Sequence, residues 1–267
     1  MNESQLFTAD ELPVVETRNA QADGHVVLAC EHASAAIPAS LEGLGLAPEA
    51  RLSHVAWDPG ALEVAEHMAA ALNAPLVASR VSRLVLDCNR PPEAPDAIPE
   101  VSEVHEVPGN RGITQTARAI RAAEIYEPFH ARLGQVLDSV LVSARAPVLV
   151  TVHSFTPVYR GKPREVEIGF LHDADSRLVD ALLAHAGQGP LAGRDVRRNA
   201  PYGPGDGVMH TLRRHGEARG LLHVMIEIRN DLIGTEATQA DIGRRLATAL
   251  QSALDGLAPA SPSAGHR

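Results

Sequence analysis

Short apolar runs recur along the chain, and segments with helical spacing of apolar residues separate them. Residues 26–30 (VVLAC) are continuously apolar and rich in β-branched side chains, which is typical of a strand buried on both faces of a sheet. Other runs of this kind predict further strands. They cover residues 75–79, 84–88, 147–153, 166–171 and 223–229.

Helical periodicity fills the segments between these runs. In 60–73, Leu62, Ala65 and Met68 fall on one face of a helix. The same spacing predicts helices over 116–144, 175–187 and 236–254. Because strands and helices alternate, we expect an α/β fold: a three-layer α/β/α sandwich with a mixed, largely parallel sheet.

Two segments are too rich in Pro, Gly and charge for regular structure. Residues 90–112 and 196–217 are predicted to be loops, and loops of that length in compact domains are often functional. We therefore expect both to rim a site. A chain of 267 residues suits one domain, predicted here over 21–256, with an N-terminal extension at 1–20 and a flexible tail at 257–267.

Composition narrows the classes of function. Aromatic residues make up 3% of the chain and the formal net charge is −9, which argues against a nucleic-acid-binding surface. No run approaches the ~18 apolar residues of a membrane span, and the N-terminus lacks the pattern of a secretory signal. Cys30 and Cys88 lie in apolar runs and imply no disulfide framework. A cytoplasmic protein without nucleic-acid or membrane partners is expected.

Two histidines stand where predicted strands end. His32 follows the run 26–30, and His153 closes the run 147–153. In open α/β sheets, ligands collect beyond the carboxyl ends of the strands. Zinc is bound by imidazole nitrogens and carboxylate oxygens of rigidly held side chains. His32 and His153 are therefore candidate metal ligands.

A third ligand has several candidates. Asp58 precedes Pro-Gly at the start of a predicted helix, where it could bind a metal or cap that helix. Glu31 neighbours His32, although successive side chains of a strand point to opposite faces. His54 is the remaining competitor. Asp58 ranks first.

Charged residues also interrupt two apolar runs. The run that begins at Ser82 ends in Asp87-Cys88-Asn89-Arg90, and an Arg side chain can hold a carboxylate bidentately; a surface ion pair is the alternative. Glu227 and Arg229 lie within a late apolar run. Buried charges cost free energy unless they are paired or lie beside a metal, so these residues suggest a site; a solvated edge strand is the alternative.

The order of these blocks resembles the N-formylglutamate amidohydrolase family and, more distantly, zinc carboxypeptidases and the succinylglutamate desuccinylase/aspartoacylase group. The resemblance runs from about Val26 to Ile233. It rests on EHASAAIP (31–38), HVAWDPGA (54–61), SRLVLDCNR (82–90), PGN (108–110), HSFTPV (153–158), NAPYG (199–203), HTLRRHG (210–216) and IEIRNDLI (226–233).

This resemblance implies a zinc carboxypeptidase-like fold and one zinc ion per chain. His32 and His153 would bind the metal, and Glu227 would be the catalytic acid/base. The carboxypeptidase-like group has a carboxylate ligand three residues after its first His. That position is Ala35 here. The third ligand must come from elsewhere, and Asp58 is the provisional choice.

The expected reaction is hydrolysis of the amide of an N-acyl acidic amino acid such as N-formyl-L-glutamate, releasing formate. Arg90 is expected to act in catalysis by holding a substrate carboxylate together with Asn89. Other residues expected to contact substrate are Arg83, Ser154, Arg213 and Arg229. Alternatives are a zinc hydrolase of this fold acting on another N-acyl amino acid or small peptide, and a metal-free module that binds acidic metabolites.

Overall fold

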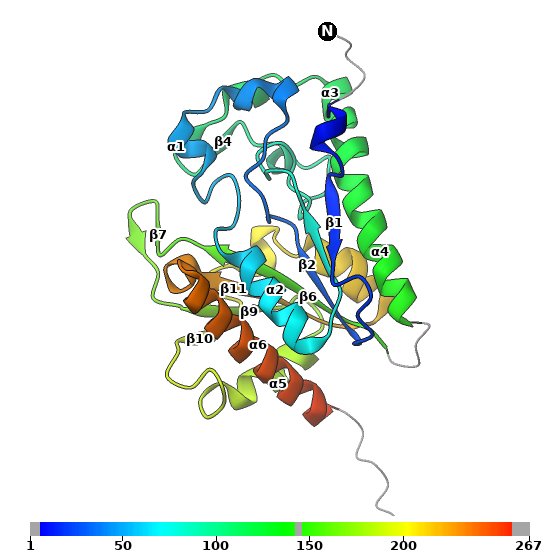
Figure 1. The fold of residues 1–267 in the computed structure, drawn as a ribbon. Coiled ribbons are helices and arrows are strands. Elements are labelled where there is room, and N and C mark those ends of the chain that lie inside the picture. The colour runs from blue at the N-terminus through cyan, green and yellow to red at the C-terminus, as the bar shows by residue number, and fades with distance from the viewer. Residues whose placement is uncertain (1–5, 142–145, 258–267) are drawn as a thin grey trace, which may run out of the picture.

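The computed structural model describes residues 6–141 and 146–257, and its centre is a sheet of seven strands (Figure 1). The strand order is β1-β3-β2-β6-β11-β9-β10. Strands β3, β2, β6 and β11 run parallel, as do β9 and β10, whereas β1 pairs with β3 and β9 with β11 in antiparallel fashion. The strands are β1 Val15–Arg18, β2 Val26–Cys30, β3 Leu76–Ser79, β6 Val148–Phe155, β9 Ile168–Leu171, β10 Val196–Arg198 and β11 Leu222–Arg229.

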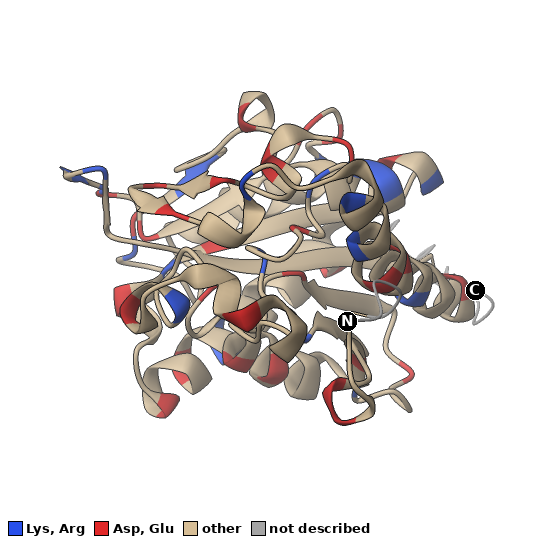
Figure 2. Cartoon of the chain, turned by 90° about the horizontal axis from the view of Figure 1, so that it is seen from above, with Lys and Arg blue, Asp and Glu red and all other residues tan. Residues whose placement is uncertain are grey.

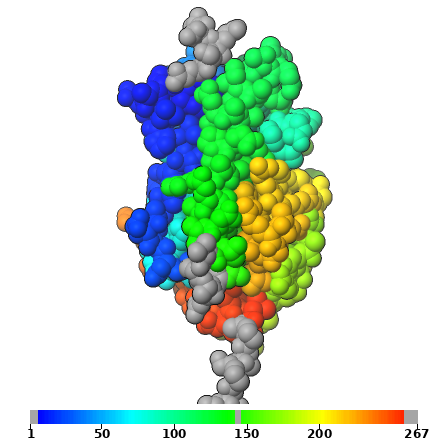
Figure 3. Space-filling view, turned by 90° about the vertical axis from the view of Figure 1, so that its right-hand side faces the viewer, coloured from blue at the N-terminus to red at the C-terminus, as the bar shows by residue number. Residues whose placement is uncertain are grey.

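Helices cover both faces of this sheet. In Figure 1, α2, α5 and α6 lie on one side and α4 on the other, and Figure 3 shows α3 and α4 running down the outside of the molecule. The helices are α1 Pro48–Arg51, α2 Ala61–Leu72, α3 Gln115–Arg121, α4 Glu127–Leu141, α5 Arg177–Ala186 and α6 Glu236–Leu257. The three-layer α/β fold with a mixed, mostly parallel sheet is confirmed.

Shorter elements connect these layers. Two small hairpins are formed by β4 Val101–Ser102 with β5 His105–Glu106, and by β7 Val158–Tyr159 with β8 Lys162–Pro163. Short 3-10 segments are Ala9–Glu11, Ala39–Gly45, Pro95–Ala97, Pro108–Asn110, Pro204–Asp206, Glu217–Arg219 and Asn230–Ile233. Single π-helical turns are Ala122–Tyr126, which joins α3 to α4, and Leu212–Gly216.

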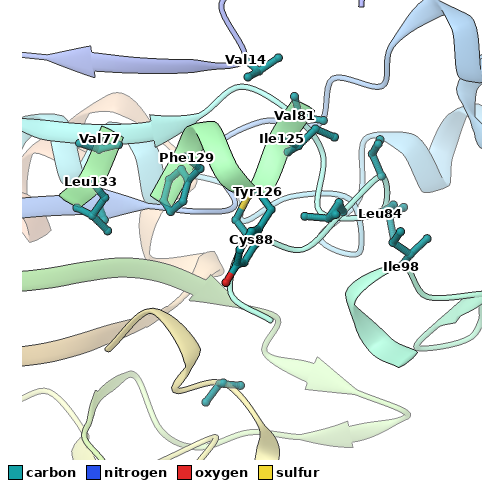
Figure 4. Close-up of a cluster of buried hydrophobic side chains, with 14 of the residues drawn as sticks. Val14, Val77, Val81, Leu84, Cys88, Ile98, Ile125, Tyr126, Phe129 and Leu133 are labelled. Atoms are coloured by element: carbon teal, nitrogen blue, oxygen red, sulfur yellow. The ribbon is translucent and has the colours of Figure 1, made fainter. Parts of the chain in front are cut away.

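The core consists of two apolar layers separated by the sheet. Alternate residues of β2 divide between them: Val27 and Ala29 face the α4 layer, whereas Val26 and Leu28 face the layer of α2, α5 and α6. Figure 4 shows the α4 layer, where Phe129 and other α4 side chains pack against the sheet and nearby loops. Strands buried on both faces explain why their sequences are continuously apolar. Both cysteines are buried and unpaired.

The strand predicted over 84–88 is wrong. This segment is buried but irregular, and its backbone groups bond to loops and side chains. Asp87 N donates to Ala97 O at 2.8 Å, and the side chain of Asn110 donates to Leu84 O at 2.8 Å. An apolar run reports burial, and burial alone does not require a strand partner.

Other differences lie at the sheet edges. Strand β1 falls within the expected extension 1–20, and β10 falls within the expected loop 196–217. Both are short edge strands with polar side chains, so neither produces an apolar run.

The helix predicted over 116–144 is present as α3, the π-helical turn and α4. Residues 142–144 of that prediction, and 258–267 of the predicted tail, lie outside the described residues.

Candidate active site

A cavity of about 550 Å³ opens at the carboxyl ends of β2, β6 and β11. Its lining includes several buried polar side chains, among them His32, Asp58, Asp87, His153 and Glu227. Both predicted rims are confirmed. Residues 90–112 contribute Arg90, Asp96, Pro99, Val101, Ser102 and Glu103 to the lining, and residues 196–217 contribute Pro201, Tyr202, Asp206 and Val208.

His32, Asp58 and His153 converge at the bottom of this cavity. Asp58 Oδ2 lies 3.3 Å from His32 Nδ1 and 2.9 Å from His153 Nδ1. All three residues are buried, and one ligand atom from each lies within 4.8 Å of the others. The helix-capping alternative for Asp58 is not realised, because the N-cap of α2 is Gly60 and the Asp58 carboxylate faces the histidines. These residues could hold a metal ion.

The outer nitrogen of each imidazole faces a further buried carboxylate. His32 Nε2 lies 2.7 Å from Asp87 Oδ1, and His153 Nε2 lies 3.2 Å from Glu31 Oε2. Metal-binding histidines characteristically place their second nitrogen against a carboxylate, which fixes the tautomer and the ring orientation. This arrangement leaves both Nδ1 atoms directed at Asp58.

The charges of the site favour a cation. Glu31, Asp58 and Asp87 are buried carboxylates, and Arg83, whose Nη1 lies 3.1 Å from Asp58 Oδ1, is the guanidinium paired with this cluster. If both imidazoles are neutral, three carboxylates against one guanidinium leave two negative charges. A divalent cation would neutralise them, and an imidazole-carboxylate donor set suits zinc. The residues therefore fit such a metal.

The pKa values of these groups reflect the same excess of negative charge. Burial alone lowers the pKa of His32, but the charges of Asp87 and Asp58 outweigh it and raise the pKa above its ordinary value. His153 shifts in the same direction, because Glu31 and Asp58 oppose its burial. Burial raises the pKa of Asp58, but His32 and Arg83 hold it well below its usual range.

Glu227 lies beside this group. It is directly in register with His153 on the neighbouring parallel strand, and its side chain lines the cavity. Its Oε2 is buried and has no hydrogen-bond partner in the described part of the chain. Burial, with a contribution from the charge of Asp58, raises the pKa of Glu227 to about 7. A carboxyl group of this kind can both accept and donate a proton near neutral pH.

Arg83 is anchored through all of its nitrogens. Nε donates to Val55 O at 3.2 Å and Nη2 donates to His54 O at 2.6 Å, while Nη1 faces Asp58. Its positive charge is therefore fixed at the bottom of the cavity. His54 Nε2 lies 2.7 Å from Glu103 Oε2, and His54 does not belong to the His32–Asp58–His153 group.

The other predicted substrate contacts are mostly engaged in holding the protein together. Both ends of the Asn89 amide are bonded, with Nδ2 donating to Val208 O and Oδ1 accepting from Thr211 N. Ser154 donates through its backbone N to Asp58 Oδ2 and through Oγ to Pro59 O. These contacts support the cavity wall and the Asp58 carboxylate.

Arg90 lines the cavity, with Nε on Asp96 Oδ2 at 2.8 Å and Nη1 on the carbonyl oxygens of Asn89 and Gly207. Arg213 and Arg229 lie outside the lining. Arg213 pairs with Asp173, and Arg229 pairs with Asp231 and donates to the backbone of residues 164 and 165.

Asp87 is a buried site residue that the sequence pattern does not single out. It belongs to the block before Arg90, although an acidic residue within an apolar run is itself a signal of a buried carboxylate. Its contact with His32 joins residues 55 positions apart, and no spacing rule gives that pairing.

The fold and the cavity define an α/β protein with a buried His-Asp-His group and a neighbouring glutamate. The chain belongs to the N-formylglutamate amidohydrolase family, which it matches over residues 24–234. This membership places it among hydrolases that cleave amide bonds. Within the described residues, every helix is too short or too polar to span a membrane.

The solved structures similar to this chain include the following two. The crystal structure of gene product Atu2144 from Agrobacterium tumefaciens is 51% identical, with a TM-score of 0.92, covering 95% of this chain and 99% of that chain. N-formylglutamate amidohydrolase from Ralstonia eutropha JMP134 is 18% identical, with a TM-score of 0.59, covering 87% of this chain and 95% of that one. At that identity the likeness shows the fold. No curated protein matches the chain.

Proposed function

We propose that the protein hydrolyses the amide of an N-formyl acidic amino acid, such as N-formyl-L-glutamate, to formate and the free amino acid. Family membership supports the reaction class. The observation that carries the proposal is the convergence of His32, Asp58 and His153 beside the unpartnered carboxyl oxygen of Glu227. A metal site next to a free acid/base is what metal-assisted amide hydrolysis requires.

One zinc ion per chain would be held by His32, Asp58 and His153. When bound, zinc supplies Lewis acidity and lowers the pKa of water towards neutrality. The carboxylates of Asp87 and Glu31 would orient the two imidazoles from behind.

Glu227 would be the acid/base. Its Oε2 takes a proton from the attacking water and then delivers it to the nitrogen of the leaving amino acid, as the carbon–nitrogen bond breaks. Burial raises the pKa of Glu227 above its ordinary value, which suits a carboxyl group that must both take up and release a proton. General acid–base catalysis of this kind contributes roughly 10²–10⁴-fold to the rate.

The first test combines metal content with formate release. Untagged wild-type protein should contain about one zinc per chain and release formate from N-formyl-L-glutamate. His153→Ala should lose both properties, because it removes a ligand. Glu227→Gln should keep the metal and lose about 10²–10⁴-fold in kcat. His185→Ala, an exposed histidine of α5, is the matched control and should keep both.

The outcomes separate the alternatives. If the protein contains zinc but releases no formate, the metal site is supported and the substrate is another N-acyl amino acid or a small peptide. Wild-type protein without a stoichiometric metal would overturn the metallohydrolase and favour a metal-free module that binds acidic metabolites. The kinship to zinc carboxypeptidases, the single domain and the cytoplasmic location stay predictions.

A further inference from the structure

Arg164 is a cavity residue that none of the motifs singled out. It follows β8 directly, at the base of the β7–β8 hairpin, which projects from the left of the molecule in Figures 1 and 2. Its backbone N donates to Pro157 O at 2.8 Å, and its carbonyl oxygen accepts from Arg229 Nη1 at 3.1 Å. The main chain is thus fixed on both sides of this residue.

Three aromatic rings surround its guanidinium. Cζ lies 4.5 Å from the ring centre of Tyr159, 4.8 Å from that of Tyr202 and 5.5 Å from that of Phe155. In addition, Nη1 donates to the Tyr202 hydroxyl oxygen at 3.0 Å. Cation–π contacts orient a guanidinium and leave its positive charge in place. The group is therefore held in one position without being neutralised.

Arg164 differs from Arg83 and Arg90 in its charge pairing. Across residues 6–141 and 146–257, Arg164 has no acidic oxygen within 4.0 Å, whereas Arg83 pairs with Asp58 and Arg90 pairs with Asp96. Its single side-chain hydrogen bond in this part of the chain is the one to Tyr202. A half-buried cation is costly without a counter-charge, so an anionic ligand would be stabilised strongly here.

We propose that Arg164, positioned by Tyr202, binds a carboxylate of the N-acyl amino acid substrate. This inference rests on the proposed function. Arg164 replaces Arg90 as the residue expected to bind a substrate carboxylate, because Nε and Nη1 of Arg90 already bond to the cavity rim. Tyr202 assists directly. Since its oxygen already accepts from Arg164, its hydrogen is free to be donated to the same carboxylate.

The protonation of Tyr202 fits this role. Burial raises its pKa to about 12, and the charge of Glu227 acts in the same direction. The hydroxyl therefore keeps its proton at the working pH. Together the guanidinium and the hydroxyl form a donor pair at the cavity wall, with Glu227 lining the same cavity.

The experiment compares three substrates that differ in one charge: N-formyl-L-glutamate, N-formyl-L-glutamine and N-formyl-L-isoglutamine. Wild type should prefer N-formyl-L-glutamate over at least one of the two amides by roughly 10- to 100-fold in kcat/KM, the usual weight of a charge-assisted hydrogen bond. The amide that is rejected identifies the bound carboxylate. Arg164→Met should lose this preference, mainly through KM.

Matched variants distinguish recognition from folding. Arg164→Lys keeps the charge and should restore part of the preference. Tyr202→Phe removes one hydroxyl and should weaken the preference by about three- to tenfold. Lys162→Met removes a charge from the same hairpin outside the cavity lining and should change nothing. The melting temperature of each variant shows whether a loss of substrate preference comes from a loss of stability. If Arg164→Met is unstable, the substrate preference of Tyr202→Phe tests the inference instead.

Calorimetric binding of L-glutamate separates this inference from the proposed function. If wild type releases no formate from any substrate, the proposed function fails, and the binding measurement still tests whether Arg164 binds a carboxylate. Wild type should bind L-glutamate at least tenfold more tightly than Arg164→Met. Equal binding by the two proteins, no binding by wild type, or an unchanged substrate preference in Arg164→Met and Tyr202→Phe would overturn the inference.

Discussion

At the scale of single residues, the carboxylates behind the imidazoles decide how well the site can hold a cation. Asp87 contacts the outer nitrogen of His32, and Glu31 faces that of His153. Such partners keep the ligand nitrogen unprotonated and correctly aimed, and their loss commonly costs 10–100-fold in metal affinity. Asp87 is the better test because its contact is the shorter of the two.

Asp87→Ala should therefore weaken zinc binding by roughly 10- to 100-fold, measured by competition with a chromogenic chelator. Asp87→Asn should lose less, since its amide oxygen can still accept from His32 Nε2. Asp206→Ala, which removes a carboxylate at the cavity rim, serves as the control. Wild-type affinity in Asp87→Ala would mean that Asp87 does not orient His32.

The sequence shows only part of this arrangement. His32, His153 and Glu227 could be singled out because polar residues at the ends of apolar strands are unusual and share one sheet edge. The sequence could not predict that Arg90 has an acidic partner and Arg164 has none among the described residues, because ion pairing depends on the tertiary structure. Arg90 pairs with Asp96 six residues away, whereas Arg164 donates to the hydroxyl of Tyr202, which lies 38 residues away.

At the scale of secondary structure, apolar runs located the buried strands, but not their neighbours. The segment 84–88 is as apolar as a central strand, yet side chains such as Asn110 satisfy its carbonyl groups. Conversely, β10 is an edge strand that contains two arginines, so its sequence shows no apolar run. Periodicity reports burial, and hydrogen-bond partners are set by the whole fold.

Gly169 of β9 shows how one element positions another. It lies opposite Glu227 in the antiparallel ladder, and a Cβ atom there would lie 1.9 Å from Ala200 O. The segment that crosses Gly169 leads to Tyr202. Gly169→Ala should displace this segment, lower the free energy of unfolding by about 1–3 kcal/mol and raise KM for the N-formyl substrate.

Thermal unfolding and formate-release kinetics would check both effects. Gly256→Ala is the control. Gly256 lies in α6, and a Cβ atom added there would have no other atom within 4 Å, so alanine should be neutral or slightly stabilising. If Gly169→Ala melted and turned over like wild type, the close approach to Ala200 would not position the cavity wall.

At the scale of the whole molecule, a chain of hydrogen bonds joins the surface to the site. Arg219 Nη1 lies 3.1 Å from His215 Nδ1, His215 Nε2 lies 2.9 Å from His130 Nδ1, and His130 Nε2 lies 2.9 Å from Cys88 O. Because Arg219 can only donate and a carbonyl can only accept, every bond is satisfied when both imidazoles are neutral. The chain connects α4, residues 212–219 and the loop that carries Asp87.

Acid should break this chain. Burial lowers the pKa of His130 to about 4 and that of His215 to about 3, below the ordinary value of 6.5. Between about pH 6.5 and 4 the unfolded chain therefore binds more protons than the folded protein, so the free energy of unfolding falls as the pH falls. For His130 alone the fall from pH 7 to 5 should be roughly 1–2 kcal/mol.

Urea unfolding at pH 7, 6 and 5 would measure this loss. The His130→Gln variant should be less stable than wild type at pH 7 but lose less stability on going to pH 5, because one buried base is gone. His32 and His153 have raised pKa values and act in the opposite direction, but they are present in both proteins and cancel in the comparison. His185→Ala, an exposed histidine, should follow the wild-type curve. Equal pH dependence in wild type and His130→Gln would show that His130 takes up its proton without loss of the folded state.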